Sequence, residues 1–186
     1  MKIRNQFFFV CTILLLTITI FTSCVTTSTG AKQNQTEFDG YWTKKDASKI
    51  SNSFFDNLDS SSVFEKFFQT YGRKPVVILG MFEDISGEDL NLEMLKTEVE
   101  NDFISESDKL EYIKNESNAT VDLFAEEVGA DLQFNATVMT KLEESDSRKT
   151  RTFIVTAELC DVNTNEKLWS SENSEISKTV KRTVKN

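Results

Sequence analysis

The chain has no histidine among its 186 residues, and its cysteines and carboxylates are the first candidates for chemistry. The lack of histidine excludes a Ser-His-Asp or Cys-His nucleophile system and any zinc site with an imidazole ligand. Paired carboxylates could act as general acid and base, since aspartate and glutamate total 30 residues. However, no motif sets any of these acids apart from a charged surface. We therefore expect no catalytic residue, bound metal or cofactor.

Cys24 follows a segment with the features of a secretory signal peptide. Two basic residues without an acid come first, and the stretch from Phe7 to Phe21 is then almost entirely apolar, which is the order found in export signals. This stretch is short for a membrane-spanning helix, which needs roughly 20 apolar residues. Residues 1–23 are therefore predicted to be a signal peptide, and an uncleaved signal anchor is the alternative.

The small residues Thr22 and Ser23 directly before Cys24 resemble a bacterial lipobox. In that motif the cysteine thiol receives a diacylglycerol, the chain is cut before the cysteine, and the new amino terminus is acylated by a fatty acid such as palmitate. Phe21 stands where the usual lipobox has leucine. The resemblance implies a lipoprotein that is attached to a membrane through Cys24.

Cys160 has no intramolecular disulfide partner once Cys11 leaves with the signal peptide and Cys24 carries lipid. Exported proteins often use disulfides. Because Cys160 has no partner, this domain is expected to be stabilised by packing instead. Because Cys160 lies in a predicted strand, we expect it to be a small buried apolar side chain and not a reactive thiol.

The net charge argues against several kinds of partner. The whole chain carries −9, and loss of Lys2 and Arg4 with the signal peptide leaves 19 basic against 30 acidic residues, which is −11. An acidic domain without a concentrated basic run is a poor candidate for binding nucleic acid or anionic lipid headgroups. We expect no nucleic-acid partner, and membrane contact through the lipid alone.

The chain after the signal peptide divides into a tether and one domain. Residues 24–40 contain hardly any large apolar side chain and no periodicity, which predicts a flexible tether that begins at the lipidated Cys24. The sixteen residues after the cysteine would span about 55 Å when fully extended. Residues 41–186 are long enough for a single globular domain with its own core.

Apolar periodicity predicts the secondary structure of this domain. The expected helices are residues 46–58, 62–72, 90–104, 118–129 and 174–186, and the expected strands are residues 75–82, 109–115, 130–144, 150–162 and 168–171. Asp46 is expected to cap the first helix, and Ser62 with Glu65 to form a capping box in the second. The order predicts an α/β (α+β) sandwich, with a small mixed β-sheet of four to five strands flanked by about four helices.

Side-chain patterns predict which faces are buried. The aromatic stripe Phe64, Phe67, Phe68 and Tyr71 is expected to pack onto the sheet, and a groove for a partner is the alternative. The uncharged residues 75–82 predict a central strand covered on both faces. The alternation in residues 130–144 predicts a strand with one wet face, on which Leu142 points inward.

Three segments follow the lipobox: GRKPVVILGMFED (residues 72–84), GADLQFNATV (residues 129–138) and RTFIVTAELCDVNTNEKLWSSENSEISKTVKR (residues 151–182). Together they resemble the LpoB family, whose members are outer-membrane lipoproteins that activate penicillin-binding proteins. The resemblance extends from Tyr41 to Arg182, which is nearly all of the domain, in the order expected for the family. The resemblance implies a fold similar to the amino-terminal domain of TolB.

The resemblance also implies a function in peptidoglycan biosynthesis and cell shape. The protein would be a non-enzymatic regulator, lipid-anchored in the outer membrane and facing the periplasm, that binds and activates a class A penicillin-binding protein. Val25 after the lipidated cysteine is not the aspartate that retains lipoproteins inside in some enteric bacteria, which favours the outer membrane. We expect a monomer, and we assign no partner-binding residue.

Two features depart from the family pattern. Well-known members have a long proline-rich tether, whereas this one is short and lacks proline, and the loop after residues 110–115 is shorter than expected. One alternative is a subunit of an envelope secretion or assembly complex related to curli-secretion lipoproteins, but these need long amphipathic hairpins that this sequence lacks. Another is a small-molecule-binding or catalytic periplasmic lipoprotein, which the missing histidine and nucleophile motifs disfavour.

Overall fold

The computed structural model describes residues 40–117, 119–171 and 174–181. The predicted signal peptide over residues 1–23, the lipidation site Cys24 and the rest of the tether up to residue 39 lie outside the described residues. Within the described part of the chain, none of the helices is long and apolar enough to span a membrane.

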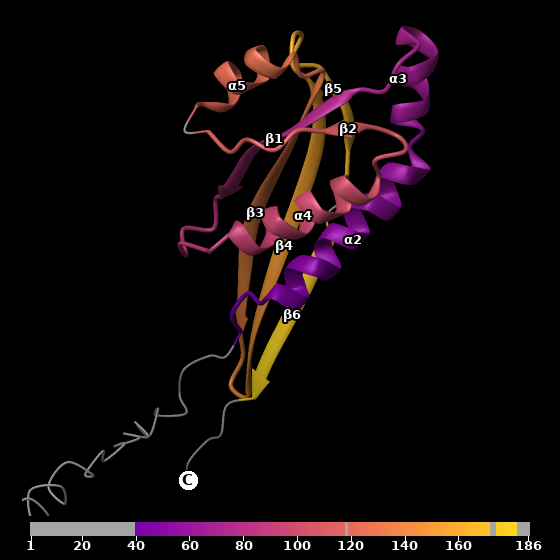
Figure 1. The fold of residues 1–186 in the computed structure, drawn as a ribbon. Coiled ribbons are helices and arrows are strands. Elements are labelled where there is room, and N and C mark those ends of the chain that lie inside the picture. The colour runs from indigo at the N-terminus through magenta and orange to yellow at the C-terminus, as the bar shows by residue number, and fades with distance from the viewer. Residues whose placement is uncertain (1–39, 118, 172–173, 182–186) are drawn as a thin grey trace, which may run out of the picture. The chain divides into compact units, whose positions relative to one another are not determined.

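A mixed sheet of six strands forms the centre of the domain (Figure 1). Its strands are β1 (Val76–Asp84), β2 (Glu111–Tyr112), β3 (Leu132–Glu144), β4 (Arg148–Asp161), β5 (Lys167–Ser170) and β6 (Ser174–Lys181). The order is β2-β1-β3-β4-β5, and β6 also pairs with β4. β1 runs parallel to β2 and β3, whereas β4 runs antiparallel to β3, β5 and β6. The predicted mixed sheet is confirmed, with one strand more than the four to five expected.

Four helices flank this sheet in the described part of the chain. They are α2 (Lys44–Ser60), α3 (Val63–Tyr71), α4 (Glu93–Ser105) and α5 (Val121–Val128). α2 and α4 cross one face of the sheet, and α5 lies at one end of the domain (Figure 1). The predicted fold class, with a mixed sheet and about four helices, is therefore confirmed.

Local sequence explains where the helices begin and end. Thr43 is the N-cap of α2, and its hydroxyl and the Asp46 carboxylate form a reciprocal capping box. The prediction that Asp46 is itself the cap was wrong by one turn, because its carboxylate reaches back to the Thr43 N–H at 2.8 Å. The predicted capping box at Ser62 was also wrong, since Ser62 has φ +58° and its side chain makes no capping hydrogen bond.

The main core lies between the sheet and helices α2 to α4. Its centre is aromatic: the ring of Phe134 on β3 lies 5.2 Å from Phe103 on α4 and 6.1 Å from Phe54 on α2, between centroids. All three side chains are fully buried. A second, smaller cluster lies on the opposite face, where Phe124 and Ala125 of α5 pack with Ile78. β1 is therefore covered on both faces around Ile78, as predicted.

The carboxyl-terminal segment differs most from expectation. Residues 174–186 were predicted to form a helix, but residues 174–181 form strand β6, which pairs with β4 from Arg148 to Val155. Ile176 and Val180 are four residues apart, and this spacing fits one face of a strand as well as one face of a helix. The open edge of β4 supplies backbone partners that decide in favour of the strand.

Two smaller expectations about burial were also wrong. Leu142 is 45% exposed, because the pairing of β3 with β1 ends at Val138 and β3 continues beyond the core. In α3 the predicted aromatic stripe is only half buried, since Phe64 and Phe67 are buried whereas Phe68 and Tyr71 are exposed.

The start of the described domain is fixed to the sheet by two basic side chains. Arg151 on β4 donates a hydrogen bond to the carbonyl oxygen of Gly40 at 3.2 Å, and its guanidinium lies 5.9 Å from the centre of the Tyr41 ring. Lys178 on β6 donates to the carbonyl oxygen of Tyr41 and pairs with the Asp46 carboxylate. Two strands therefore hold the backbone that leads into α2.

Candidate functional site: the open face of the sheet

One face of the sheet is covered by α2 and α4, and the opposite face carries α5 at one end (Figure 1). We call this opposite face the open face. Side chains of β3 and β4 that point to it form the cross-strand pairs Gln133–Cys160, Asn135–Glu158, Thr137–Thr156 and Met139–Ile154. These residues alternate with the buried side chains of the core. The open face is thus mostly polar and carries amide, hydroxyl and carboxylate side chains.

A groove of about 860 Å³ lies on the open face between α5 and the strands. Four carboxylates contribute to its walls: Glu83 from β1, Asp122 and Glu126 from α5, and Glu158 from β4. None of the described residues that line it is basic. We call this hollow the acidic groove.

A β-bulge places one apolar side chain at the acidic groove. In the pairing of β1 with β3, Leu79 is opposite Phe134 and Phe82 is opposite Ala136, so two residues of β1 face the single residue Asn135. The extra residue turns Met81 outward, where its side chain is 65% exposed and lines the groove. Bulges commonly re-aim a side chain in this way.

Asn135 satisfies the backbone group that the bulge leaves without a ladder partner. The Met81 N–H donates to Asn135 Oδ1 at 2.9 Å, and Gln133 Nε2 donates to the same oxygen at 2.8 Å. A methyl group on Gly80 would overlap Asn135 Oδ1 and Gln133 Nε2. Glycine is therefore required at position 80, because the amide lies directly against its backbone.

The carboxylates of the acidic groove differ in their partners. Glu158 forms an ion pair with Lys167 of β5 at 2.6 Å. Glu83, Asp122 and Glu126 are exposed, and none of them makes an ion pair with another described residue. Two walls of the groove, β1 and α5, therefore carry negative charge that the described part of the chain does not neutralise.

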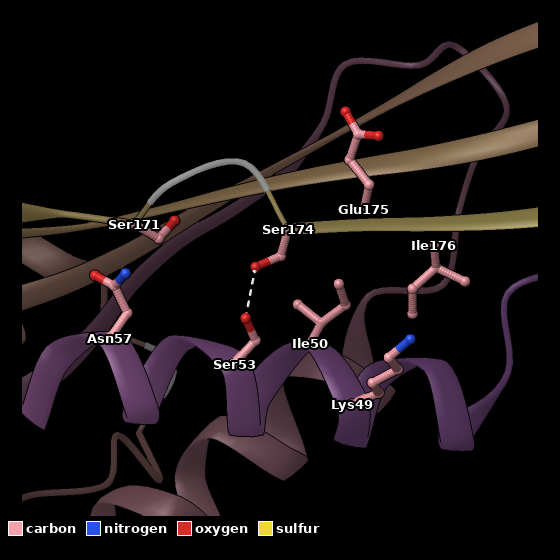
Figure 2. A pocket seen from close by; sticks show the side chains of 8 residues that line it. All are labelled: Lys49, Ile50, Ser53, Asn57, Ser171, Ser174, Glu175 and Ile176. Carbon is pink, nitrogen blue, oxygen red and sulfur yellow. Dashed lines mark hydrogen bonds between the residues drawn. The ribbon is translucent and has the colours of Figure 1, made fainter.

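A second, smaller pocket of about 270 Å³ lies between α2 and the start of β6 (Figure 2). The hydroxyls of Ser53 and Ser174 are 3.1 Å apart across it, and Trp169 Nε1 donates to Asn57 Oδ1 beside it. Figure 2 shows Glu175 pointing away from α2. The Ser53–Ser174 hydrogen bond therefore links α2 to β6 across this pocket.

The residues predicted to do chemistry have different outcomes. Cys24 lies outside the described residues, so its lipidation stays a prediction. Cys160 is buried, as predicted, and burial is the main cause that raises the pKa of its thiol. No group of three or more cysteine, aspartate and glutamate side chains within the described residues is placed to hold a metal ion.

The acidic groove itself was not predicted from the sequence. Its carboxylates come from β1, α5 and β4, and no sequence spacing connects them. One local signal was present: Gly80 interrupts an otherwise apolar strand, and a glycine inside a strand often marks a bulge or a close backbone approach.

Comparisons with known proteins agree with the resemblance drawn from the motifs. A family model described as the peptidoglycan-synthase activator LpoB matches residues 104–175. No curated protein matches the sequence.

Several solved structures are similar at low sequence identity. The crystal structure of lipoprotein GNA1162 from Neisseria meningitidis has a TM-score of 0.40 and 12% identity, covering 60% of this chain and 87% of that one. The LpoB C-terminal domain from Escherichia coli has a TM-score of 0.37 and 12% identity, covering 62% and 96%. A PelC dodecamer from Paraburkholderia phytofirmans has a TM-score of 0.34 and 14% identity, covering 57% and 70%.

The matched segment runs from the end of α4 to the start of β6 and includes α5, β3 and β4. Over residues 104–175 the chain therefore matches the LpoB family of peptidoglycan-synthase activators, as its motifs predicted.

Proposed function

We propose that this protein is a lipid-anchored, non-enzymatic activator that binds a class A penicillin-binding protein in the periplasm and stimulates its peptidoglycan synthesis. The observation that carries the proposal is the match of residues 104–175 to the peptidoglycan-synthase activator LpoB. This segment supplies β3, β4 and α5, which form most of the open face. The proposal thus joins the family match to a surface that could receive a partner.

The activator would work through binding alone. A protein without catalytic groups can raise the rate of an enzyme only if it binds the more active conformation more tightly than the less active one. A rigid sheet suits this role, because β3 and β4 pair without a break over thirteen residue pairs from Leu132–Asp161 to Glu144–Lys149. The binding surface would therefore keep its shape while the synthase changes conformation.

Lipid attachment at Cys24 to the outer membrane would set the reach of the domain. The sixteen residues from Val25 to Gly40 can extend over about 55 Å, but as a flexible coil they cover about 20–25 Å. The domain would therefore remain close to its membrane, and the synthase would have to extend toward it. Replacement of Cys24 by alanine should abolish incorporation of radiolabelled palmitate and leave an uncleaved precursor. Retained label would contradict the anchor.

The activator role can be tested with the complete lipoprotein in detergent. Cells that produce the protein are treated with a crosslinker, and the proteins joined to it are identified by mass spectrometry. The purified synthase is then assayed for glycan polymerisation and peptide crosslinking with and without the lipoprotein. We expect recovery of a penicillin-binding protein and a several-fold higher polymerisation rate. Failure to recover any such synthase, together with an unchanged rate, would overturn the proposal.

A further inference from the structure

We propose that the acidic groove is the docking site for a cationic segment of the synthase, and that Met81 is its apolar contact. This inference rests on the proposed function and adds to it the place and the chemistry of the contact. It assigns the groove one occupant, an extended or helical piece of the partner protein that carries several lysine or arginine residues.

Charge is the first argument for this occupant. Three carboxylates of the groove, from Glu83, Asp122 and Glu126, make no ion pair with the described residues, and no basic side chain lines the groove among those residues. The chain as a whole carries −9. Charged patches of this kind select partners of opposite sign and speed their association. A basic protein segment satisfies this condition, whereas nucleic acid and anionic lipid do not.

The arrangement of the carboxylates is the second argument. Asp122 and Glu126 are four residues apart on α5, so they lie on the same side of the helix, and Glu83 lies on β1. None of the described acidic residues converge closely enough to hold a metal ion. Negative charge that is spread along a groove, and not focused at one point, fits several cations carried on one chain.

The bulge in β1 is the third argument. Gly80 and Met81 interrupt the pairing with β3, and Asn135 and Gln133 form two hydrogen bonds that hold this irregular geometry. The result is a methionine that is 65% exposed beside three carboxylates that make no ion pair with the described residues. Methionine adapts its shape to apolar partners, so Met81 can cover the aliphatic part of a lysine or arginine side chain. The groove therefore offers both charge and apolar contact.

The test uses the complete lipoprotein in detergent and the purified synthase recovered with it. Glu126→Lys reverses a charge inside the groove, and Glu127→Lys makes the same change at the next residue of α5, outside the groove. Both glutamates are exposed and lie near the carboxyl end of the helix, where a lysine is favourable. The two variants should therefore unfold at the same temperature.

We expect Glu126→Lys to weaken binding to the synthase by about tenfold, and the double variant Asp122→Lys/Glu126→Lys to weaken it further. Glu127→Lys should change the affinity by less than about twofold. Met81→Ala should weaken binding without altering its dependence on salt, because it removes an apolar contact. The wild-type affinity should fall as salt is raised, and the double variant should show a smaller dependence.

The outcomes separate this inference from the proposed function. Equal binding and equal stimulation by the wild type and all groove variants would overturn the docking site and leave the activator role standing. No binding and no stimulation by the wild type would overturn both. A change in sedimentation of the lipoprotein alone on Glu126→Lys would show that a second copy of this chain occupies the groove, and would also overturn the inference.

Discussion

Arg73 and Asp131 are joined by two parallel hydrogen bonds, with Nη1 2.6 Å from Oδ2 and Nη2 2.7 Å from Oδ1. The same carboxylate accepts a hydrogen bond from the Val76 N–H at 2.8 Å. Asp131 therefore ties the end of the α5 segment to the start of β1. Because Arg73 lies directly after α3, three elements meet at this one carboxylate.

The two partners should contribute unequally to stability. The Asp131 side chain is 15% exposed and bonds a backbone group, whereas the Arg73 side chain is 53% exposed. We expect Asp131→Ala to lower the free energy of unfolding by about 1–3 kcal/mol, because it leaves the Val76 N–H without its partner. Arg73→Ala should cost less than about 1 kcal/mol. Urea unfolding of the two variants measures both values, and equal losses would contradict the role given to the backbone bond.

The charged Asp102 carboxylate should lower stability at neutral pH, whereas the Asp131 carboxylate raises it. Burial raises the pKa of the Asp102 carboxyl, and the negative charges of Glu98 and Glu106 raise it further. The hydrogen bond that this carboxyl accepts from the buried Ser51 hydroxyl lowers the pKa, but by less. A carboxyl with a raised folded pKa costs stability at neutral pH, and the cost disappears as pH falls through that pKa. We expect Asp102→Asn to be more stable than the wild type at pH 7, with a gap that shrinks in acid.

Asp131 supplies the comparison for this pH experiment. Burial acts to raise its pKa, but the hydrogen bonds from Arg73 and Val76 and the charge of Arg73 together lower it. Its contribution is therefore present above the unfolded pKa of about 3.9 and is lost as pH falls through the lower folded value. Asp131→Asn should thus be less stable than the wild type at pH 7. Thermal melts between pH 7 and pH 3 test both signs, and two gaps of the same sign would contradict them.

The bulge makes Gly80 sensitive to the smallest substitution. In Gly80→Ala the new methyl group would displace the Asn135 amide and break its bond to the Met81 N–H. We expect a loss of about 1–3 kcal/mol in the free energy of unfolding. Guanidinium titration measures it, and a loss below about 0.5 kcal/mol would contradict the close contact.

A double-mutant cycle supplies the control. Asn135→Ala removes one of the two side chains that the methyl group would meet. Gly80→Ala combined with Asn135→Ala should therefore cost less than the sum of the two single changes, because they remove the same interaction. Additive losses would show that the glycine is required for another reason.

Phe134 should be among the most sensitive positions of the core. Its ring lies within 6.3 Å of four other aromatic rings, measured between centroids, and it is fully buried. We expect Phe134→Ala to lower the free energy of unfolding by about 3–5 kcal/mol, because the cavity cannot close inside a ring cluster. Phe68→Ala on α3 is the matched control: that ring is 55% exposed, and its loss should change stability by at most about 0.5 kcal/mol.

The sequence predicted the parts of this fold that depend on local periodicity. The helices around Ile50, Leu95 and Phe124 and the strands around Ile78 and Phe153 follow from apolar spacing, and the structure contains them. Strand β6 was not predicted because the charged Lys178 lies on the inward side between Ile176 and Val180. It interrupts the alternation of apolar and polar residues that would indicate a strand. Its charge is accommodated by Asp46, which is 132 residues earlier in the chain. No local pattern contains that contact.

Sequence patterns could not predict the candidate site for a similar reason. The acidic groove exists only because α5 lies beside β1 and β4, and helix α5 was predicted without its position. Gly80 could have suggested a bulge, but only the register against Phe134 and Ala136 shows that Met81 turns outward. The family resemblance, in contrast, could be read directly, because the motifs in residues 129–138 and most of residues 151–182 fall within the matched segment.

The attachment of Gly40 and Tyr41 to Arg151 and Lys178 has a mechanical consequence. Tension applied to the chain before Gly40 is transmitted by these two contacts to β4 and β6 before it can separate α2 from the sheet. β4 is paired along its length with β3, so a pull is shared by many backbone bonds loaded together. Force transmitted by the predicted tether would therefore load the sheet before it loads α2.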